Sequence, residues 1–133
     1  MIAFFVPGIP IPQGSHRVSR SGHIYDSNKN LTAWRDTIRK VASTRRPLKP
    51  IDTPVKVEAA FFFEKPRTTR FKEAPSGKGP GDLDKLLRAI GDGLEQSRIL
   101  TNDARIVEWH ATKSWCRQGE KPGAKIIIEK AHT

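Results

Sequence analysis

Two aspartates separated by one residue, Asp82 and Asp84, stand where a loop enters a predicted helix, and Asp103 follows that helix after a turn. Residues two apart do not face each other inside a regular helix. At the helix boundary, however, an extended Asp82 and a first-turn Asp84 can converge, and the returning chain can add Asp103. Three adjacent carboxylates repel one another unless a cation neutralises them. A site that offers hard oxygen ligands and also takes phosphate oxygens is typical of magnesium.

Such a site would support hydrolysis of a phosphodiester, because two magnesium ions stabilise both the attacking water and the leaving 3′ oxygen. The same acids also have a structural interpretation. Asp is a favoured helix cap, acids in a first turn complement the helix dipole, and Asp103 alone would suit a turn. Spacing leaves both interpretations open. An acidic cluster in an otherwise strongly basic chain favours the catalytic one.

The charge of the chain favours nucleic acid as its partner. Lys and Arg outnumber Asp and Glu by 24 to 14 in 133 residues, for a net charge of +10 and a pI near 10.2. Such a field concentrates polyanions. An anionic membrane surface is a weaker candidate partner, because the sequence shows no long basic amphipathic helix. The single Cys116 excludes an internal disulfide and a cysteine-rich zinc site. We expect a soluble, cytoplasmic protein without a small-molecule cofactor.

The elements that would position the acids follow from hydrophobic periodicity. Alternation and short apolar runs predict strands over residues 2–6, 55–63, 106–115 and 124–129. Within the third of these, Val107, Trp109 and Ala111 are expected to share a face. Steps of three and four residues predict two helices, with these apolar positions: Leu31, Trp34, Ile38 and Val41 in the first; Leu83, Leu86, Leu87, Ile90 and Leu94 in the second.

The ends of these helices have candidate signals of their own. Ser27, Asn28 or Asn30 would cap the first helix, and Pro47 and Pro50 would end it. The second would cover residues 82–93, with Gly93 as its terminator. The polar stretch 13–27 is expected to be a loop or a weak hairpin. Together the elements predict one α/β (α+β) domain over residues 1–133, a small mixed sheet with two main helices packed on it.

A long basic connection, residues 65–81, precedes the paired acids. A loop of this length is uncommon in a compact domain unless it is functional or disordered. Its positive charge makes contact with phosphates the natural functional interpretation, and a solvated flexible loop remains the alternative. We expect the DNA contacts to involve these basic residues: Arg17, Arg20, Arg35, Arg67, Arg70, Lys72, Lys78 and Lys85.

A longer pattern surrounds the three acids, and it consists of Asp82-Leu83-Asp84, Leu86, Arg88, Asp92, Leu94 and Asn102-Asp103-Ala104-Arg105-Ile106. This pattern resembles the motif of the RusA family of Holliday junction resolvases. The resemblance extends more loosely over most of the chain, to these segments: Val6-Pro7-Gly8-Ile9-Pro10, Trp34-Arg35 and residues 55–63.

The resemblance implies a homodimer that binds four-way and other branched DNA, with one metal site per subunit. Mg²⁺ would be the cofactor, with Mn²⁺ as a substitute. Strands of like polarity would be nicked to leave 5′-phosphate and 3′-hydroxyl ends, in recombination and repair, in a bacterium or its phage. The family's essential acids fall on Asp82, Asp84 and Asp103, and its basic helix residue falls on Arg88.

Three positions depart from the family pattern. Lys85 stands where the family has Asn, Arg88 where it has Lys, and Asn102 where it has the first Asp of a pair. Arg88 can bind a phosphate but cannot act as a general base, because its guanidinium does not lose its proton. Asp92 lies four residues after Arg88, and this spacing predicts a helical ion pair. A non-catalytic basic protein that binds DNA or RNA is the alternative function.

Overall fold

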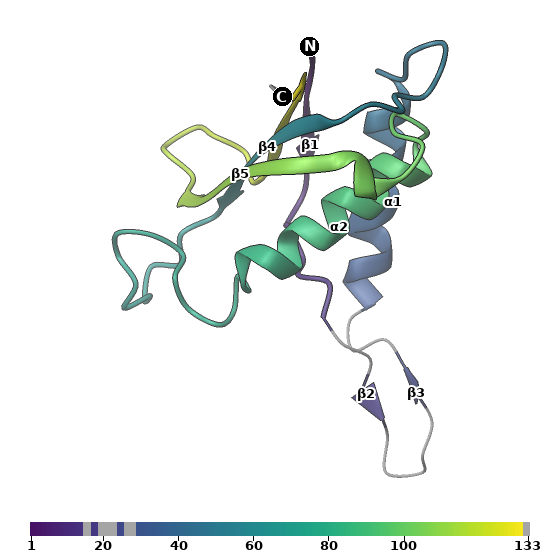
Figure 1. Ribbon diagram of the computed structural model, residues 1–133. Helices are drawn as coiled ribbons and strands as arrows, with labels where there is room; N and C mark the ends of the chain where they lie inside the picture. Colours follow the sequence, from purple (N-terminus) through teal and green to yellow (C-terminus); the bar gives the residue numbers. More distant parts are fainter. Residues whose placement is uncertain (15–16, 19–23, 26–28, 132–133) are drawn as a thin grey trace.

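The computed structural model describes residues 1–14, 17–18, 24–25 and 29–131. The elements follow one another along the chain (Figure 1) as β1 (Ile2–Pro7), β2 (Arg17–Val18), β3 (Ile24–Tyr25), α1 (Lys29–Ser43), β4 (Val55–Phe63), α2 (Leu83–Gln96), the short 3₁₀ helix η1 (Asp103–Arg105), β5 (Ile106–Trp115) and β6 (Gly123–Lys130). The predicted strands and both predicted helices are therefore present. β2 and β3 pair with each other within the stretch predicted to be a loop or weak hairpin.

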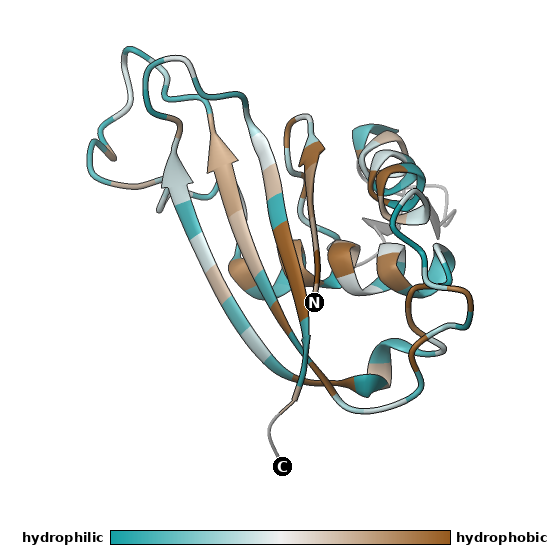
Figure 2. Cartoon of the chain, turned by 90° about the horizontal axis from the view of Figure 1, so that it is seen from above, coloured by the Kyte–Doolittle hydropathy of each residue, from teal (hydrophilic) through white to brown (hydrophobic). Residues whose placement is uncertain are grey.

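The main sheet has four strands in the order β1-β6-β4-β5. β4 and β5 are parallel, whereas β6 runs antiparallel to both β1 and β4. Parallel neighbours need a crossover connection, and α2 provides it between β4 and β5. Both helices lie on the same side of the sheet (Figures 1 and 2). The prediction of a small α+β domain with a mixed sheet and two helices is confirmed.

Alternation along β4 separates the two faces of the sheet. Its odd-numbered residues, from Val55 to Phe63, are buried beneath the helices, and its even-numbered residues are only partly buried. The open face carries charge, because the Lys56 ammonium lies 3.6 Å from the carboxylates of both Glu58 and Glu108. The negative charge of Glu108, and to a smaller extent that of Glu58, raises the pKa of the Lys56 ammonium. One face of the sheet is thus core and the other is a solvated surface.

Helix α1 buries Leu31, Trp34 and Ile38 as its periodicity predicts, together with Ala42, whereas the predicted Val41 is only partly buried. It ends at Ser43, before either proline, and Asn30 lies inside it rather than at its cap. The other two candidate caps lie outside the described residues. Over the part of the chain that the structure describes, neither helix combines the length and the apolar character needed to cross a bilayer.

Gly93 does not end α2, which continues to Gln96. A Cβ atom on Gly93 would lie 2.3 Å from Cγ2 of Ile38, a fully buried side chain of α1. The glycine is therefore present because the two helices approach each other too closely for any side chain. The prediction that Gly93 ends the helix was wrong because glycine occurs both at helix ends and at close helix–helix contacts, and sequence alone does not distinguish the two.

A β-bulge interrupts β5 near its start. Ile106 pairs with Val55 and Glu108 pairs with Lys56, which leaves Val107 as an extra residue. Val107 is 61% exposed, so the prediction that it shares a face with Trp109 was wrong. The extra residue shifts the alternation by one position. As a result Ile106 and Trp109, three residues apart, both lie on the side of the sheet that faces α2.

Candidate functional site

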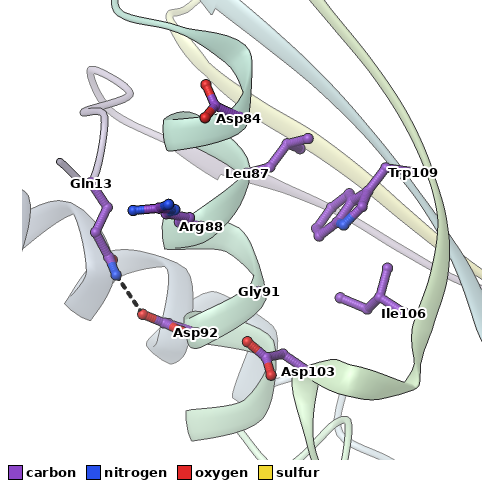
Figure 3. A pocket seen from close by; sticks show the side chains of 9 residues that line it. All are labelled: Gln13, Asp84, Leu87, Arg88, Gly91, Asp92, Asp103, Ile106 and Trp109. Carbon is purple, nitrogen blue, oxygen red and sulfur yellow. Dashed lines mark hydrogen bonds between the residues drawn. The ribbon is translucent and has the colours of Figure 1, made fainter. Parts of the chain in front are cut away.

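A pocket of about 390 Å³ lies between α2, η1, the start of β5 and the segment that follows β1. Figure 3 shows its apolar wall on one side of α2 and Gln13 on the other. Nine residues line it: Gln13, Asp84, Leu87, Arg88, Gly91, Asp92, Asp103, Ile106 and Trp109. Two of the three predicted acids and the predicted basic residue of α2 are therefore in one pocket.

Helix α2 supplies the long wall of the pocket. Asp84, Arg88 and Asp92 recur every four residues, so they lie in one row along the helix. At 1.5 Å per residue, Asp84 and Asp92 are about 12 Å apart along the helix axis. Each acid of this row is thus four residues, or about one turn, from the guanidinium of Arg88. The row alternates negative, positive and negative charge along the pocket.

Asp103 faces the pocket from η1, opposite the second half of α2. The space between them is kept by Gly91, because a Cβ atom there would lie 3.7 Å from Oδ2 of Asp103. Asp103 was a candidate turn residue, but other side chains make the hydrogen bonds that hold this turn. Asn102 Oδ1 accepts the Ala104 N–H at 2.8 Å, and Glu95 Oε1 accepts the Asp103 N–H at 2.9 Å. The carboxylate of Asp103 therefore takes no part in these bonds and faces the pocket.

A brace beneath η1 fixes the turn that carries Asp103. Asp52 Oδ1 accepts hydrogen bonds from the Thr101 hydroxyl at 2.5 Å and from Arg105 Nε at 2.9 Å. The Thr101 hydrogen bond, followed by that of Arg105 and its charge, lowers the pKa of Asp52. Backbone bonds join Ile51 to Ile99 and Thr101 on the same side. The position of Asp103 is thus determined by a segment that lies between α1 and β4.

Asp82 occupies the N-cap position of α2 in an extended conformation, yet its side chain makes no capping hydrogen bond. Its carboxylate is exposed and does not line the pocket. The turn before it is held by the Lys113 ammonium, which donates to the Gly81 carbonyl at 2.8 Å. Gly81 has a φ of +94° and lies against Pro12, where a Cβ would come within 2.6 Å. Asp82 is therefore neither a helix cap nor close-packed with the other two acids.

Asp92 accepts a hydrogen bond from Gln13 Nε2 at 2.7 Å, and no ion pair with Arg88 is formed among the described residues. The Gln13 N–H donates to the Lys85 carbonyl at 3.0 Å, and Arg35 donates to Gln13 Oε1 at 3.4 Å. Sequence reasoning missed Gln13. Its partner is 79 residues away, and a glutamine after a proline run carries no local signal of a site.

The predicted DNA-contacting residues separate into different surroundings. Arg35 is half-buried behind the pocket, and its Nε atom is buried with no hydrogen-bond partner in the structure. Lys85 is half-buried on α2, the side chain of Arg17 in β2 is not described, and Arg20 lies outside the described residues. The remaining four are exposed on the basic loop: Arg67, Arg70, Lys72 and Lys78.

The chemistry of the pocket suits a divalent cation. In the described part of the chain, no hydrogen bond or ion pair is made by the carboxylates of Asp84 and Asp103, and Gly91 leaves room between helix and turn. The described residues contain no group of three His, Cys, Asp or Glu side chains arranged to hold a metal. Mg²⁺ does not require one, since it is commonly bound by one or two carboxylates, waters and substrate phosphates.

Comparison with known proteins identifies the family of the chain. The family model described as endodeoxyribonuclease RusA matches residues 7–129, which include every residue that lines the pocket. No individual curated protein matches the sequence. Because the family match covers nearly the whole chain, the protein belongs to the RusA endodeoxyribonuclease family, a family of Holliday junction resolvases.

Proposed function

We propose that this protein is a divalent-metal-dependent endonuclease that resolves four-way junctions and cuts other branched DNA. The observation that carries the proposal is that the carboxylates of Asp84 and Asp103 face one pocket without partners among the described residues, in a chain with a net charge of +10. A basic surface attracts the DNA backbone, whereas unpaired acids at one place would repel it. A bound cation would explain why these acids are present on a surface that binds DNA.

Asp84 and Asp103 would each offer one carboxylate to a cation and the substrate phosphates from opposite ends of the pocket, because Gly91, which faces Asp103, is about 10 Å along the helix from Asp84. Asp82, at the start of α2 and outside the pocket lining, would be a further ligand. Mg²⁺ is the expected metal and Mn²⁺ its substitute. When bound, the metal would polarise the scissile phosphate and lower the pKa of a bound water. Asp92 is oriented by Gln13, and this hydrogen bond keeps it beside the pocket. Leu87, Ile106 and Trp109 line the opposite wall, so they exclude bulk water from that side.

Arg88 would bind the phosphate rather than move a proton. It is exposed, it lines the pocket between the two acids of its row, and its guanidinium stays charged at any working pH. A guanidinium can contact two phosphate oxygens at once, which orients the scissile group as well as attracting it. The exposed cations of the basic loop would contact neighbouring phosphates along the same strands.

Resolution of a four-way junction requires two symmetric cuts, and a two-fold homodimer would provide that symmetry. Each subunit would then nick one of two strands of like polarity and leave 5′-phosphate and 3′-hydroxyl ends that a ligase can seal. The proposed setting is recombination and repair in the cytoplasm of a bacterium, with the gene carried by the cell or by a phage. These steps rest on membership of the family.

The test is cleavage of a labelled four-way junction beside a linear duplex of the same sequence, with Mg²⁺ and with a chelator. We expect paired, ligatable nicks in the junction alone and only with the metal. Asp84→Asn should abolish cutting while junction binding survives. The matched control is Asp36→Asn, an acid exposed on α1 and paired, within the part of the chain that the structure describes, with Arg39 at 3.4 Å, which should cut normally. Tight binding with no cutting under any divalent metal would instead support the non-catalytic DNA-binding function.

A further inference from the structure

A second pocket, of about 550 Å³, lies where the basic loop folds over the ends of β4 and β5 and over residues 9–11. Figure 1 shows the loop extending beyond these strand ends before it enters α2. The aromatic rings of Phe63, Phe71 and Trp115 and the prolines Pro66 and Pro80 form much of its wall. This pocket has no part in the site described above.

The pocket is built by specific contacts. Trp115 Nε1 donates to the Phe71 carbonyl at 2.8 Å, which ties the middle of the loop to the end of β5. The Phe71 ring lies against Gly77, where a Cβ would come within 2.6 Å of it, and the Arg70 guanidinium is 5.0 Å from its centroid. These contacts hold the loop in shape, so the aromatic wall exists before any ligand binds.

The charge around the pocket indicates what it would receive. Five basic residues occur in loop 65–81 against the single acid Glu73. Lys78 lines the pocket itself, where Glu64 is the one acidic residue of the wall. A flat apolar ligand carried on a polyanion fits both properties, because base faces stack on aromatic rings while phosphates meet the cations. Aromatic walls combined with a basic rim are the means by which proteins hold unpaired bases.

Two short chain segments join this pocket to the acidic one. Pro80 is four residues before Asp84, and Ile11 is two residues before Gln13. Two residues span at most about 7 Å, and successive phosphates of one strand are about 3.4 Å apart along a duplex. A base in the aromatic pocket would therefore lie within a few nucleotides of a phosphate at the acidic pocket.

We propose that this aromatic pocket receives an unpaired nucleobase from the branch point of the DNA. The inference deepens the proposed function and rests on it, since branched DNA is taken as the substrate. Bases at a branch point are already unstacked or easily unstacked, so they cost less to extrude than bases within a continuous duplex. The pocket would thus discriminate branched from linear DNA before any bond is cut.

The experiment combines a change in the protein with a change in the DNA, in chelator so that no cleavage occurs. Ile9, 67% exposed at the pocket, is changed to Glu, and Phe71 is changed to Leu in a second variant. Leu48→Glu is the matched control, because Leu48 is fully exposed and outside the pocket. Each protein is titrated by fluorescence anisotropy with an intact junction and with junctions that carry one abasic residue at successive branch positions.

We expect the abasic residue at one position to weaken wild-type binding by roughly 5- to 150-fold, the range for loss of one base–aromatic stack. Ile9→Glu and Phe71→Leu should lose a similar factor on the intact junction and nothing further on that abasic junction. Such non-additivity identifies the base and the pocket as one interaction. Leu48→Glu, with the same change in charge, should follow the wild type on every DNA.

Either of two results would overturn the pocket proposal: pocket variants that bind like the wild type, or losses that stay additive at every abasic position. A change in sedimentation mass caused by Ile9→Glu would assign the pocket to contact between copies of the chain, and would also overturn it. Failure of the proposed function is distinguishable, since it would appear as wild-type protein that does not cut a four-way junction in Mg²⁺. Base binding in chelator does not depend on that outcome.

Discussion

The two faces of α2 both contain a glycine, for opposite reasons. Gly93 lies on the packed face, where a Cβ would come within 2.3 Å of the fully buried Ile38. Gly91 lies on the face of the acidic pocket, where the nearest neighbours of a Cβ would be Asp103 and Trp109, at 3.7 Å and 3.9 Å. Positions two apart are separated by about 200° around a helix of 3.6 residues per turn, so the two glycines point to opposite sides.

The difference shows what each face is shaped for. The packed face, with Leu86, Ile90 and Leu94 fully buried, leaves no room for an added carbon. The pocket face leaves room that a methyl group could enter without moving the backbone. Close packing holds α2 against α1, and the free space opposite keeps the carboxylate of Asp103 accessible. Stability and the proposed chemistry therefore depend on different sides of one helix.

The largest expected effect is on the pocket face. Asp84→Asn and Asp103→Asn should each lower junction cleavage by more than about 100-fold, because even the groups that orient metal ligands are worth 10- to 100-fold. Urea unfolding should change little, since neither carboxylate has a protein partner among the described residues. Single-turnover cleavage in Mg²⁺ measures the first effect. Near-normal cutting by both variants would assign the pocket face to structure alone.

On the packed face, Gly93→Ala should lower the free energy of unfolding by roughly 1–3 kcal/mol, the usual cost of overpacking a close-packed interior. The helix propensity of Ala works in the opposite direction, but it does not relieve the contact with Ile38. Chemical denaturation measures the change. A double variant with Ile38→Val gives the control, because it retains Cγ2 and should not restore stability.

Gly91→Ala should have the opposite signature. The added methyl group fits, and Ala favours a helix interior over Gly by about 0.5–1 kcal/mol, so the protein should become slightly more stable. The methyl group would occupy space beside Asp103 Oδ2, and cleavage should fall by about 10-fold, the lower end of the range for disturbed ligand surroundings. If Gly91→Ala and Gly93→Ala changed stability in the same direction, the contrast between the faces would fail.

The residues at the N-terminal ends of η1 and α2, Asn102 and Asp82, extend the comparison to helix caps. Asn102→Ala should cost about 1 kcal/mol, because its side chain caps η1. Asp82→Ala should change stability by less than about 0.5 kcal/mol, as expected for an exposed residue whose side chain makes no cap bond. Thermal unfolding of the two variants side by side measures the difference. A larger cost at Asp82 would show that it stabilises the helix after all.

The smallest effect concerns Asp52, an acid with protein partners, in contrast to those of the pocket. Its pKa in the folded protein is lowered from 3.8 by Thr101 and Arg105. A lowered pKa contributes stability above the unfolded value, and that contribution disappears as the pH falls through the folded value. Asp52→Asn should therefore be less stable than the wild type at pH 7, and the difference should shrink below about pH 4. Urea unfolding at pH 7 and pH 3 tests this.

Much of the fold could be predicted because its signals are local. Alternation identified β4, and apolar steps identified both helices, since one buried face imposes its period on the sequence. Asp84, Arg88 and Asp103 were recognisable from residue type and motif. Gln13 was not, because a hydrogen bond to a residue 79 positions away leaves no trace in local spacing.

Other errors share this physical origin. The close approach of Ile38 made Gly93 a packing residue, and only the three-dimensional contact shows that. The DNA contact expected of Arg35 from its charge stays a prediction, but its surroundings could not be foreseen, since it lies half-buried and donates to Gln13 from behind the pocket. An Arg on a helix gives no sign in the sequence of which neighbour it will reach. Tertiary contacts, rather than local preference, decided each of these positions.

The bulge at Val107 sets the phase of β5. Before it, side chains follow one alternation, and after it they follow the other, which is why Trp109 and Lys113 point toward α2. Deleting this one residue would make Ile106 and Glu108 consecutive, and since they already pair with the consecutive Val55 and Lys56, the strand would keep its register and regain a regular alternation. Its side chain is 61% exposed and free to vary. We therefore expect the position to tolerate many substitutions and even its deletion, whereas deleting one residue later in β5 would turn the side chains beyond it over to the opposite face of the sheet.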